Sequence, residues 1–373
     1  MRFEVTSSQG RARVGRLHTA HGVVDTPAFM PVGTLGAVKG IGPLDLAALG
    51  AQVMLANLYH LTLRPGIEVI EELGGLHAFT GWPGVLLTDS GGYQVFSLAE
   101  LREIDDQGVR FRNHLDGSPV ALTPESVVRS QERMGVDIAM VLDECPPWPV
   151  EADVAAASLE RTTRWAQRSR EAHSIAATAL FGIVQGSFYP KLRERAADSL
   201  RALDFDGYAI GGVSVGEPPR LGRSTVEQVG ALLPEDRPRY LMGLGTPADL
   251  LHGIRNGMDL FDCVLPARNA RHGLLYTRDG EIRIKNARYR DDPRPVDEAC
   301  SCPVCGSTSR AFLHHLMRSR EITAAVLATT HNLRFYLDFV ADLRHALASG
   351  DFEDSAALIA ECYAADDPGG QLS

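Results

Sequence analysis

The sequence predicts an α/β protein built on a (β/α)8 TIM barrel. Eight short, nearly unbroken apolar segments occur in order along the chain, and they end in polar or glycine-rich turns. Several of the intervals between them hold helix-like stretches, such as residues 126–134 and 155–177. Apolar strands that alternate with helices are typical of a parallel sheet covered on both faces, and eight such strands can close into a barrel.

The apolar residues place the eight predicted strands. They cover residues 28–32, 52–56, 85–87, 138–142, 180–184, 208–213, 240–244 and 260–265. An open doubly wound sheet is the alternative, but no Gly-x-Gly-x-x-Gly turn follows the first predicted strand. Before that strand, residues 3–24 carry two alternating segments joined by a short polar turn, which predicts a hairpin that caps the barrel.

The composition is that of a globular protein, and we expect it to be cytoplasmic. Of the 373 residues, 45% are hydrophobic and 23% are charged. No apolar run approaches the roughly 20 residues that cross a bilayer, so no membrane partner is expected, and the N-terminus lacks the apolar core of a signal peptide. A net charge of −10 argues against a protein that coats nucleic acid, although a local basic patch can still bind phosphates.

Residues suited to chemistry lie at or near the ends of six predicted strands. They are Asp89, Ser90, Tyr93, Asp143, Gln185, Gly212, Met242 and Asp262. In a TIM barrel these strand ends meet at one face, where active sites lie. A single Asp at a strand end is often only the cap of the next helix, but six strand ends together predict a shared pocket.

The eighth predicted strand combines a buried carboxylate with a basic stretch that follows it. Asp262 interrupts the apolar run. An ionised carboxylate is unfavourable in apolar surroundings, so it is either bonded to backbone amides or placed where chemistry needs it. Residues 268–290 contain seven Arg or Lys and only two acidic residues. A carboxylate beside such a strip predicts chemistry on a polyanion.

Three of the six cysteines form a candidate zinc site. Cys300, Cys302 and Cys305 offer three thiolates within one short segment, and a structural zinc ion needs four ligands. His314, His315 or His331 could supply the fourth, and the spacing alone does not choose among them. Three small buried cysteines are the alternative. A closed site of this kind would brace the fold rather than take part in chemistry.

Several longer motifs carry a family resemblance. They are residues 26–34 (TPAFMPVGT), 89–94 (DSGGYQ), 211–217 (GGVSVGE) and 261–266 (FDCVLP), with the cysteine and histidine set. Together they resemble the bacterial tRNA-guanine transglycosylase (queuine tRNA-ribosyltransferase) family, and the resemblance runs from about residue 3 to about residue 365.

The resemblance implies a pentosyltransferase that acts on tRNA. Such an enzyme exchanges the wobble guanine of tRNAs with GUN anticodons (for Asp, Asn, His and Tyr) for 7-aminomethyl-7-deazaguanine in queuosine biosynthesis. It works by double displacement through a covalent tRNA–aspartate intermediate. The implied partners are the tRNA anticodon loop, the two bases and a second copy of the chain in a homodimer. The implied organisation is one catalytic barrel domain over residues 1–373, with a zinc-binding subdomain inserted at 275–335 and a C-terminal helical segment at 336–365.

The same resemblance assigns roles to individual residues. Asp262 would be the nucleophile at the ribose C1′, and Asp89 would be the general acid and base. Asp143 would accept hydrogen bonds from the N1–H and exocyclic amine of the base. Gln185 and the backbone N–H of Gly212 would contact its carbonyl side.

Further residues would complete the base pocket, the tRNA-binding surface and the metal site. Tyr93 and Met242 would sandwich the ring of the base, with Ser90 and Val213 beside it. Arg268 and Arg271 would hold the anticodon. One structural Zn2+ per chain would bind the ligand set made of Cys300, Cys302, Cys305 and His331.

Two other classes of protein fit parts of the sequence. A catalytically silent tRNA-binding subunit would lack the two aspartates, which are present, and a metal-dependent barrel hydrolase would need ligands on several strand ends. Val215 and Cys145 resemble bacterial members, whose pocket takes the small aminomethyl precursor. Leu58, Val213 and Ser214 depart from the commonest bacterial pattern, and we expect them to affect pocket dimensions rather than the type of reaction.

Overall fold

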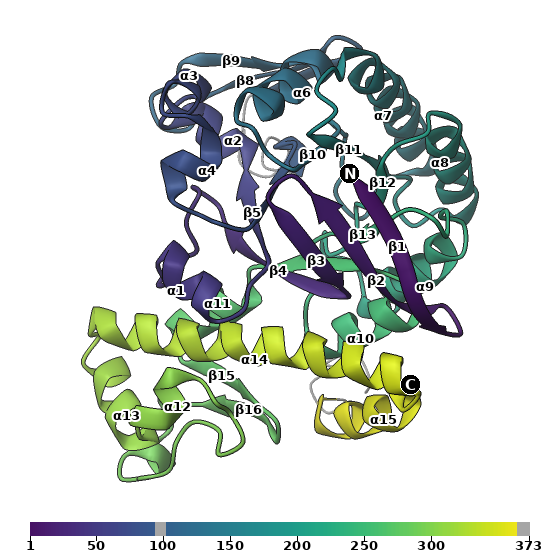
Figure 1. Cartoon of the computed structure of the whole chain (residues 1–373). Helices are drawn as coiled ribbons and strands as arrows, with labels where there is room; N and C mark the ends of the chain where they lie inside the picture. Colours follow the sequence, from purple (N-terminus) through teal and green to yellow (C-terminus); the bar gives the residue numbers. More distant parts are fainter. Residues whose placement is uncertain (94–101, 364–373) are drawn as a thin grey trace.

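The computed structural model, which describes residues 1–93 and 102–363, confirms the predicted TIM barrel (Figure 1). Eight parallel strands form a closed sheet, and the last of them pairs with the first. In barrel order they are β4 (Ala28–Gly33), β5 (Val53–Asn57), β6 (Val85–Asp89), β10 (Ile138–Met140), β11 (Ala179–Val184), β12 (Gly207–Ile210), β13 (Arg239–Leu241) and β14 (Leu260–Cys263). Gln94 of the 89–94 motif and residues 364–373 lie outside the described residues.

Four predicted strands extend too far toward their carboxyl ends. The strand predicted at 138–142 ends at Met140, the one at 208–213 at Ile210, the one at 240–244 at Leu241, and the one at 260–265 at Cys263. Pro266, which follows the last predicted strand, would be expected to end it. Instead the strand ends earlier, and Pro266 lies in the first turn of α11 (Leu265–His272). The residues beyond these ends leave the sheet and form the loops that line a cavity.

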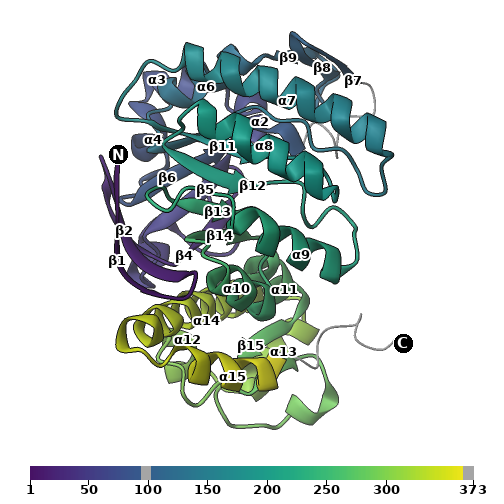
Figure 2. The same cartoon turned by 90° about the vertical axis from the view of Figure 1, so that its right-hand side faces the viewer.

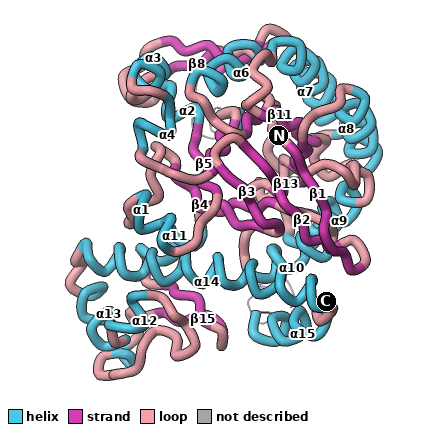
Figure 3. The backbone as a smooth tube through the Cα atoms, viewed as in Figure 1, coloured by secondary structure: helices cyan, strands magenta, loops and turns pink. Residues whose placement is uncertain are grey.

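Helices cover the outside of the barrel (Figures 2 and 3). Several begin with a proline in the first turn, where its missing N–H removes no helical hydrogen bond. The stretches predicted at 126–134 and 155–177 are confirmed as α6 (Pro124–Arg133) and α7 (Ala152–Ala172). Helix α7 begins three residues earlier and ends five residues sooner than predicted. The helices of the barrel region are α1 (Pro43–Ala48), α2 (Leu58–Leu63), α3 (Ile67–Glu72), α4 (Gly75–Thr80), α6 (Pro124–Arg133), α7 (Ala152–Ala172), α8 (Pro190–Ala202), α9 (Pro219–Gly230) and α10 (Pro247–Arg255).

An antiparallel sheet at the N-terminus lies against the amino-terminal ends of the barrel strands. The predicted hairpin is present as β1 (Arg2–Gln9) and β2 (Ala12–Thr19), and β3 (Gly22–Thr26) adds a third strand. Buried Arg13 donates two hydrogen bonds to Asp259, which directly precedes β14. The backbone N–H of Asp25 donates to Gln52, which directly precedes β5. The sheet therefore leaves the opposite end of the barrel open.

A second small sheet is inserted after β6, and the sequence analysis missed it. Its strands are β7 (Arg102–Asp105), β8 (Gly108–Arg112) and β9 (Pro119–Leu122). They are short and carry many charged residues, so they lack the continuous apolar pattern that marks the barrel strands. The indole of Trp165 on α7 donates to the carbonyl of Asp106, which anchors the sheet to the barrel.

The chain after α11 forms a second layer against the barrel (Figures 1 and 2). Its elements are β15 (Leu274–Thr277), β16 (Gly280–Arg283), a 3-10 turn at Ala287–Tyr289, α12 (Pro303–Ser307), α13 (Arg310–Arg318), α14 (Ile322–Ser349) and α15 (Phe352–Tyr363). Helix α14 runs unbroken across the predicted boundary between segments 275–335 and 336–365. The division of the chain into these segments remains a prediction. No helix within residues 1–93 and 102–363 is long and apolar enough to cross a membrane.

Candidate active site

A cavity of about 530 Å3 opens at the carboxyl ends of the barrel strands. It brings together the residues that the strand ends predicted, and Val213 and Arg268 join them. The predicted residues that line it are Asp89, Ser90, Tyr93, Asp143, Gln185, Gly212, Val213, Met242, Asp262 and Arg268. Arg271 lines a smaller, adjacent cavity instead.

Asp262 on β14 accepts hydrogen bonds from the described residues through only one of its two carboxylate oxygens. Its Oδ1 accepts hydrogen bonds from the Tyr240 hydroxyl (2.6 Å) and from the backbone N–H of Gly243 (2.9 Å). Its Oδ2 accepts none from the residues that the structure describes. Burial raises the pKa of Asp262, and the two hydrogen bonds oppose that rise because they favour the carboxylate. The carboxylate is thus fixed in position with one oxygen left for a reactant.

Asp89 at the end of β6 is the second carboxylate of the cavity. Its Oδ2 accepts from the Asn57 amide (2.6 Å), and its Oδ1 accepts from the backbone N–H of Leu58 (3.1 Å). Burial raises the pKa of Tyr240, and the negative charges of Asp262 and Asp89 raise it further. Asp89, Asp262 and Tyr240 all line this one cavity.

A third carboxylate, Asp143, lies deeper and faces polar partners. Its oxygens accept from the Ser90 hydroxyl (3.3 Å) and from the Gln185 amide (2.6 Å). Burial raises the pKa of Asp143 to about 6, although both hydrogen bonds oppose the rise. The amide oxygen of Gln185 is buried without a hydrogen-bond partner among the described residues. This part of the cavity offers acceptors and donors to a flat polar molecule.

Two glycines let the backbone approach these polar groups. A Cβ at Gly92 would lie 2.8 Å from Asp143 Oδ1. Gly212 has a φ of +64°, and a Cβ there would lie 2.4 Å from the Gln185 amide oxygen. Any other residue at either position would collide with the groups that form the pocket.

The chain is similar to known proteins over nearly its whole length. The model of the family described as queuine tRNA-ribosyltransferase matches residues 7–365. A queuine tRNA-ribosyltransferase of Desulforudis audaxviator is 54% identical over 353 residues, which cover 94% of this chain and 95% of the relative. The relative from Nitrosomonas europaea, with the same name, is 51% identical over 356 residues, which cover 95% of this chain and 96% of the relative.

The chain belongs to the queuine tRNA-ribosyltransferase family. Members of this family are pentosyltransferases, which agrees with the enzyme class that the motifs predicted. The roles of the individual side chains in this member remain predictions, and the geometry above shows only that they share one cavity.

In this member of the queuine tRNA-ribosyltransferase family, the predicted metal ligands also come together. The sulfur and ring nitrogen atoms of Cys300, Cys302, Cys305 and His331 all lie within 4.8 Å of one another. His331 presents Nδ1 to the sulfurs of Cys302 (3.6 Å) and Cys305 (3.3 Å), and its Nε2 lies 2.8 Å from the carbonyl oxygen of Tyr276. That second contact fixes the ring, as is usual for a metal-binding histidine. The set can hold a metal ion, and its donors suit tetrahedral zinc.

A second group of potential ligands does not suit a metal. His21, His77 and Asp137 lie together at the amino-terminal end of the barrel. The two rings are stacked, with centroids 3.6 Å apart and an interplanar angle of 21°. Nearly parallel rings direct their nitrogen lone pairs side by side instead of toward one point. We therefore interpret this group as a hydrogen-bonded contact between the N-terminal sheet and the barrel.

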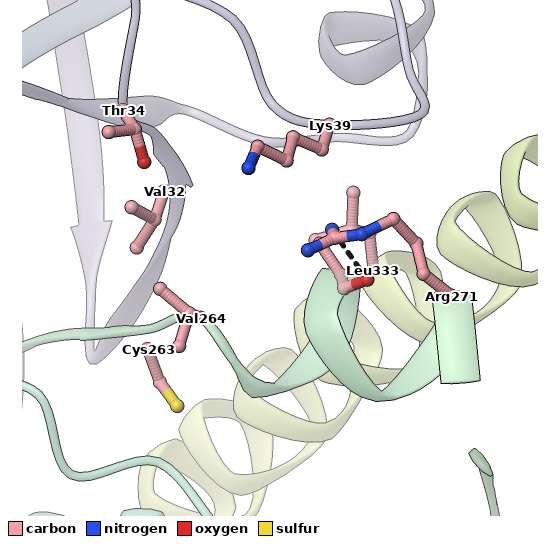
Figure 4. Close-up of a pocket in the computed structure, with 8 residues that line it drawn as sticks. Val32, Thr34, Lys39, Cys263, Val264, Arg271 and Leu333 are labelled. Carbon is pink, nitrogen blue, oxygen red and sulfur yellow. Dashed lines mark hydrogen bonds between the residues drawn. The ribbon is translucent and has the colours of Figure 1, made fainter. Parts of the chain in front are cut away.

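The smaller cavity lies beside the main one and is lined by two cations (Figure 4). Lys39 extends over it from the loop after β4, and Arg271 extends from α11. Neither has an ion-pair partner among the described residues. The two cavities share Val32, Thr34, Cys263 and Val264, so the cations line a cavity that adjoins the one containing Asp262.

Among the cavity residues that the sequence analysis missed, three lie beside the predicted site residues. Asn57 ends β5 and could have been found by the same strand-end reasoning that selected Asp89. Tyr240 looks like an ordinary apolar strand residue, and only the pairing of β13 with β14 shows that its hydroxyl reaches Asp262. Lys39 lies in a loop without any pattern in the sequence that singles it out.

Proposed function

We propose that this chain exchanges the wobble guanine of tRNAs with GUN anticodons, those for Asp, Asn, His and Tyr, for 7-aminomethyl-7-deazaguanine in queuosine biosynthesis. The observation that carries the proposal is the cavity of about 530 Å3 that holds the carboxylate of Asp262, fixed by two hydrogen bonds, together with the carboxylates of Asp89 and Asp143 and their polar partners. The names of the relatives support a tRNA substrate.

The reaction we propose has two displacement steps at the ribose C1′. Asp262 attacks C1′ through Oδ2, the oxygen that accepts no hydrogen bond from the described residues. The bond from C1′ to N9 of guanine then breaks, and Asp89 gives a proton to the leaving base. The transition state resembles an oxocarbenium ion, which a carboxylate stabilises before it forms the covalent bond. The incoming base then gives its proton to Asp89 and attacks C1′, and the bond to Asp262 breaks.

The base itself would bind between Tyr93 and Met242. Asp143 would accept from N1–H and the exocyclic amine, and Gln185 and the Gly212 N–H would donate to the carbonyl. In the absence of base, Gln185 donates to Asp143, so the base replaces one internal hydrogen bond with its own. Half of Tyr93 is exposed, which suits an aromatic that stacks on a base swung out of the anticodon loop.

The direct test is incorporation of labelled guanine into unmodified tRNA. We expect label only in tRNAs with a GUN anticodon, and we expect 7-aminomethyl-7-deazaguanine to displace the label in a later step. Absence of incorporation with all four tRNAs would contradict the proposed function.

Base affinity should depend on the ionisation of Asp143. Only the carboxylate can accept two hydrogen bonds from the base, and the pKa of Asp143 is about 6 in the empty pocket. The affinity for guanine should therefore be full above that value and fall by about tenfold for each pH unit below it. Equilibrium binding of guanine between pH 5 and pH 8 measures this.

Replacement of Asp143 with asparagine is the matched control for the pH dependence. The amide has one acceptor oxygen, so guanine should bind more weakly by about 1.5–3 kcal/mol, with no step near pH 6. An unchanged affinity in Asp143→Asn would place this residue outside the base pocket.

We propose that Arg268, Arg271 and Lys39 bind phosphates of the anticodon loop. Each replacement with alanine should weaken tRNA binding and flatten the slope of log K against log salt concentration by about 0.7–0.9. Affinity for the free base should stay the same. Arg16 is a control, because this exposed arginine lies on the N-terminal sheet at the other end of the barrel. An unchanged slope in all three variants would mean that these cations are only solvated surface charges.

We further propose that the Cys3His site holds one structural Zn2+ and that the chain forms a homodimer. Exposed apolar residues support a dimer surface on α13 and α14, where Phe312 is 51% exposed and Ile322 is 82% exposed. Val326 lies one turn after Ile322 on α14 and is 40% exposed, so the two share one face of the helix. The cytoplasmic location also remains a prediction.

A further inference from the structure

Arg193 is a charged residue that the reaction does not use directly and that is completely buried. It lies in the first turn of α8, and its side chain is 0% exposed. No carboxylate among the described residues forms an ion pair with it. Burial lowers the pKa of Arg193 to about 10, so the guanidinium stays charged at neutral pH. A buried cation without a counter-ion is unfavourable unless dense hydrogen bonding offsets the loss of hydration.

The hydrogen bonds of Arg193 all go to backbone carbonyls. Its Nε donates to Ser187 (2.6 Å), and its Nη1 donates to Val184 (2.7 Å) and to Gly211 (2.7 Å). Its Nη2 donates to Gly212 (3.2 Å). Charged donors make stronger hydrogen bonds than neutral ones, and a guanidinium fixes the relative positions of its acceptors because its donors lie in one rigid plane.

Three of these carbonyls belong to the loops that follow β11 and β12, and the fourth, Val184, is the last residue of β11. Strands β11 and β12 pair as far as Val184 and Ile210, and the backbone N–H of Gly211 still donates to the Val184 carbonyl (3.1 Å). Beyond Gly211, the described residues show no further backbone hydrogen bond between the two loops. Gln185 follows directly on one side, and Gly212 follows on the other. Ser187 and Gly212 have φ values of +50° and +64°, so both loops contain left-handed residues. Arg193 therefore bonds to both loops at the point where the backbone hydrogen bonds between them end.

The contact between the two loops is close. A Cβ at Gly211 would lie 2.8 Å from the Gln185 amide nitrogen, and one at Gly212 would lie 2.4 Å from its oxygen. A small separation of the loops would therefore move the Gln185 amide away from the Gly212 N–H. Both groups are donors for a single acceptor, and their joint strength depends on their spacing.

We propose that Arg193 is a positioning residue that sets the distance between the Gln185 amide and the Gly212 N–H, and thereby the selectivity for a base with a carbonyl group at C6. The inference rests on the proposed function, because it takes the cavity to be a purine site. It adds a residue that does not touch the base and that acts through the two loops.

The test compares three competitive inhibitors of base exchange in wild type and in Arg193→Lys and Arg193→Met. Guanine has a carbonyl at C6, 6-thioguanine replaces that oxygen with a weaker acceptor, and hypoxanthine keeps the carbonyl but lacks the amine that Asp143 would bind. We expect the preference for guanine over 6-thioguanine to fall by roughly tenfold in both variants, about the contribution of one hydrogen bond. The preference for guanine over hypoxanthine should not change, and neither should the KM for tRNA.

Arg239→Lys and Arg239→Met are the matched controls. Arg239 is also buried and donates to the carbonyls of Leu233 and Pro234, but it lies at the amino-terminal end of β13. Its variants should lower thermal stability without changing either preference. Equal preferences in wild type and the Arg193 variants would overturn the inference. Failure of both Arg193 variants to fold would also overturn it, because the residue would then serve folding alone. If wild type exchanges no guanine, the proposed function itself fails.

Discussion

Replacement of Cys302 with alanine is expected to release one metal ion per chain and to loosen the segment from Leu274 to Ser349. The loss removes one of four ligands from a closed set, and metal binding in comparable small sites contributes on the order of 10 kcal/mol to folding. Metal analysis of the purified protein and hydrogen exchange of this segment measure the two effects. We expect thermal unfolding to begin at a lower temperature in the variant.

The effect should extend from the metal site to the barrel. His331 lies on α14, and the next residue, Asn332, donates to the carbonyls of Pro266 on α11 and Leu274 on β15. One turn later, Tyr336 donates to the carbonyl of Gly245, which lines the main cavity. A metal ion that orients α14 would therefore also steady α11, which carries Arg268. We expect weaker tRNA binding in Cys302→Ala, with little change in affinity for the free base.

Cys362→Ala is the control for this experiment. Cys362 is exposed on α15 and is not part of the ligand set, so its removal should change neither the metal content nor the exchange rates. Purified wild type without stoichiometric metal would contradict the prediction. So would a Cys302→Ala variant that keeps its metal.

The barrel could be predicted from the sequence because its strands are buried on both faces. Segments such as Ala179–Val184 consist of apolar residues without a break, and only a covered parallel strand needs that pattern. The inserted strands β7 to β9 are partly exposed and carry charges, so their pattern resembles that of loops. The exact strand ends were also beyond prediction, because residues such as Val213 and Leu244 are apolar but line the cavity rather than the sheet.

Site residues that directly follow a strand could be predicted from the sequence. Residues that reach the site only through contacts between separate segments of the folded chain were harder to predict. Asp89, Asp143 and Gln185 share one cavity because parallel strands all end at the same face. Arg193 could not be singled out in this way, because an arginine in the first turn of a helix is usually exposed. Only its hydrogen bonds to four carbonyls show that it lies beside the loops that line the cavity.

Replacement of Asp262 with alanine is expected to abolish base exchange while tRNA binding remains largely intact. The carboxylate would form the covalent bond to C1′, and no other carboxylate in the described part of the cavity has the same support from Tyr240 and Gly243. We expect the exchange rate to fall by at least about 10⁴-fold, as is typical when a nucleophile is removed. Incorporation of labelled guanine and a tRNA-binding assay, both run on the same preparation, measure the two properties.

Asp249→Asn is a matched control for the loss of a carboxylate. Asp249 also lines the main cavity, but its carboxylate caps α10 by accepting from the backbone N–H of Thr246, and it accepts from the Thr246 hydroxyl as well. Its replacement should lower the free energy of unfolding by about 1 kcal/mol. Base exchange and the formation of a covalent adduct between tRNA and the protein should both remain. Loss of exchange in Asp249→Asn as well would show that the cavity is sensitive to any change of charge, and the assignment of Asp262 would then rest on the adduct alone.

The adduct decides between two mechanisms. A single direct displacement would invert the configuration at C1′, whereas two successive displacements restore the β configuration that the neighbouring nucleotides have. Asp262 is favoured as the nucleophile because its Oδ1 is fixed by two hydrogen bonds and its Oδ2 accepts none from the described residues. Asp89 accepts a hydrogen bond at each oxygen, from Asn57 and from Leu58, so neither oxygen is as free to attack C1′ as Oδ2 of Asp262. Wild type given tRNA and a poor acceptor base should therefore accumulate a tRNA adduct that survives denaturation, and peptide mapping should locate it at Asp262. An adduct at Asp89, or exchange activity in Asp262→Ala, would reverse the assignment of the two carboxylates.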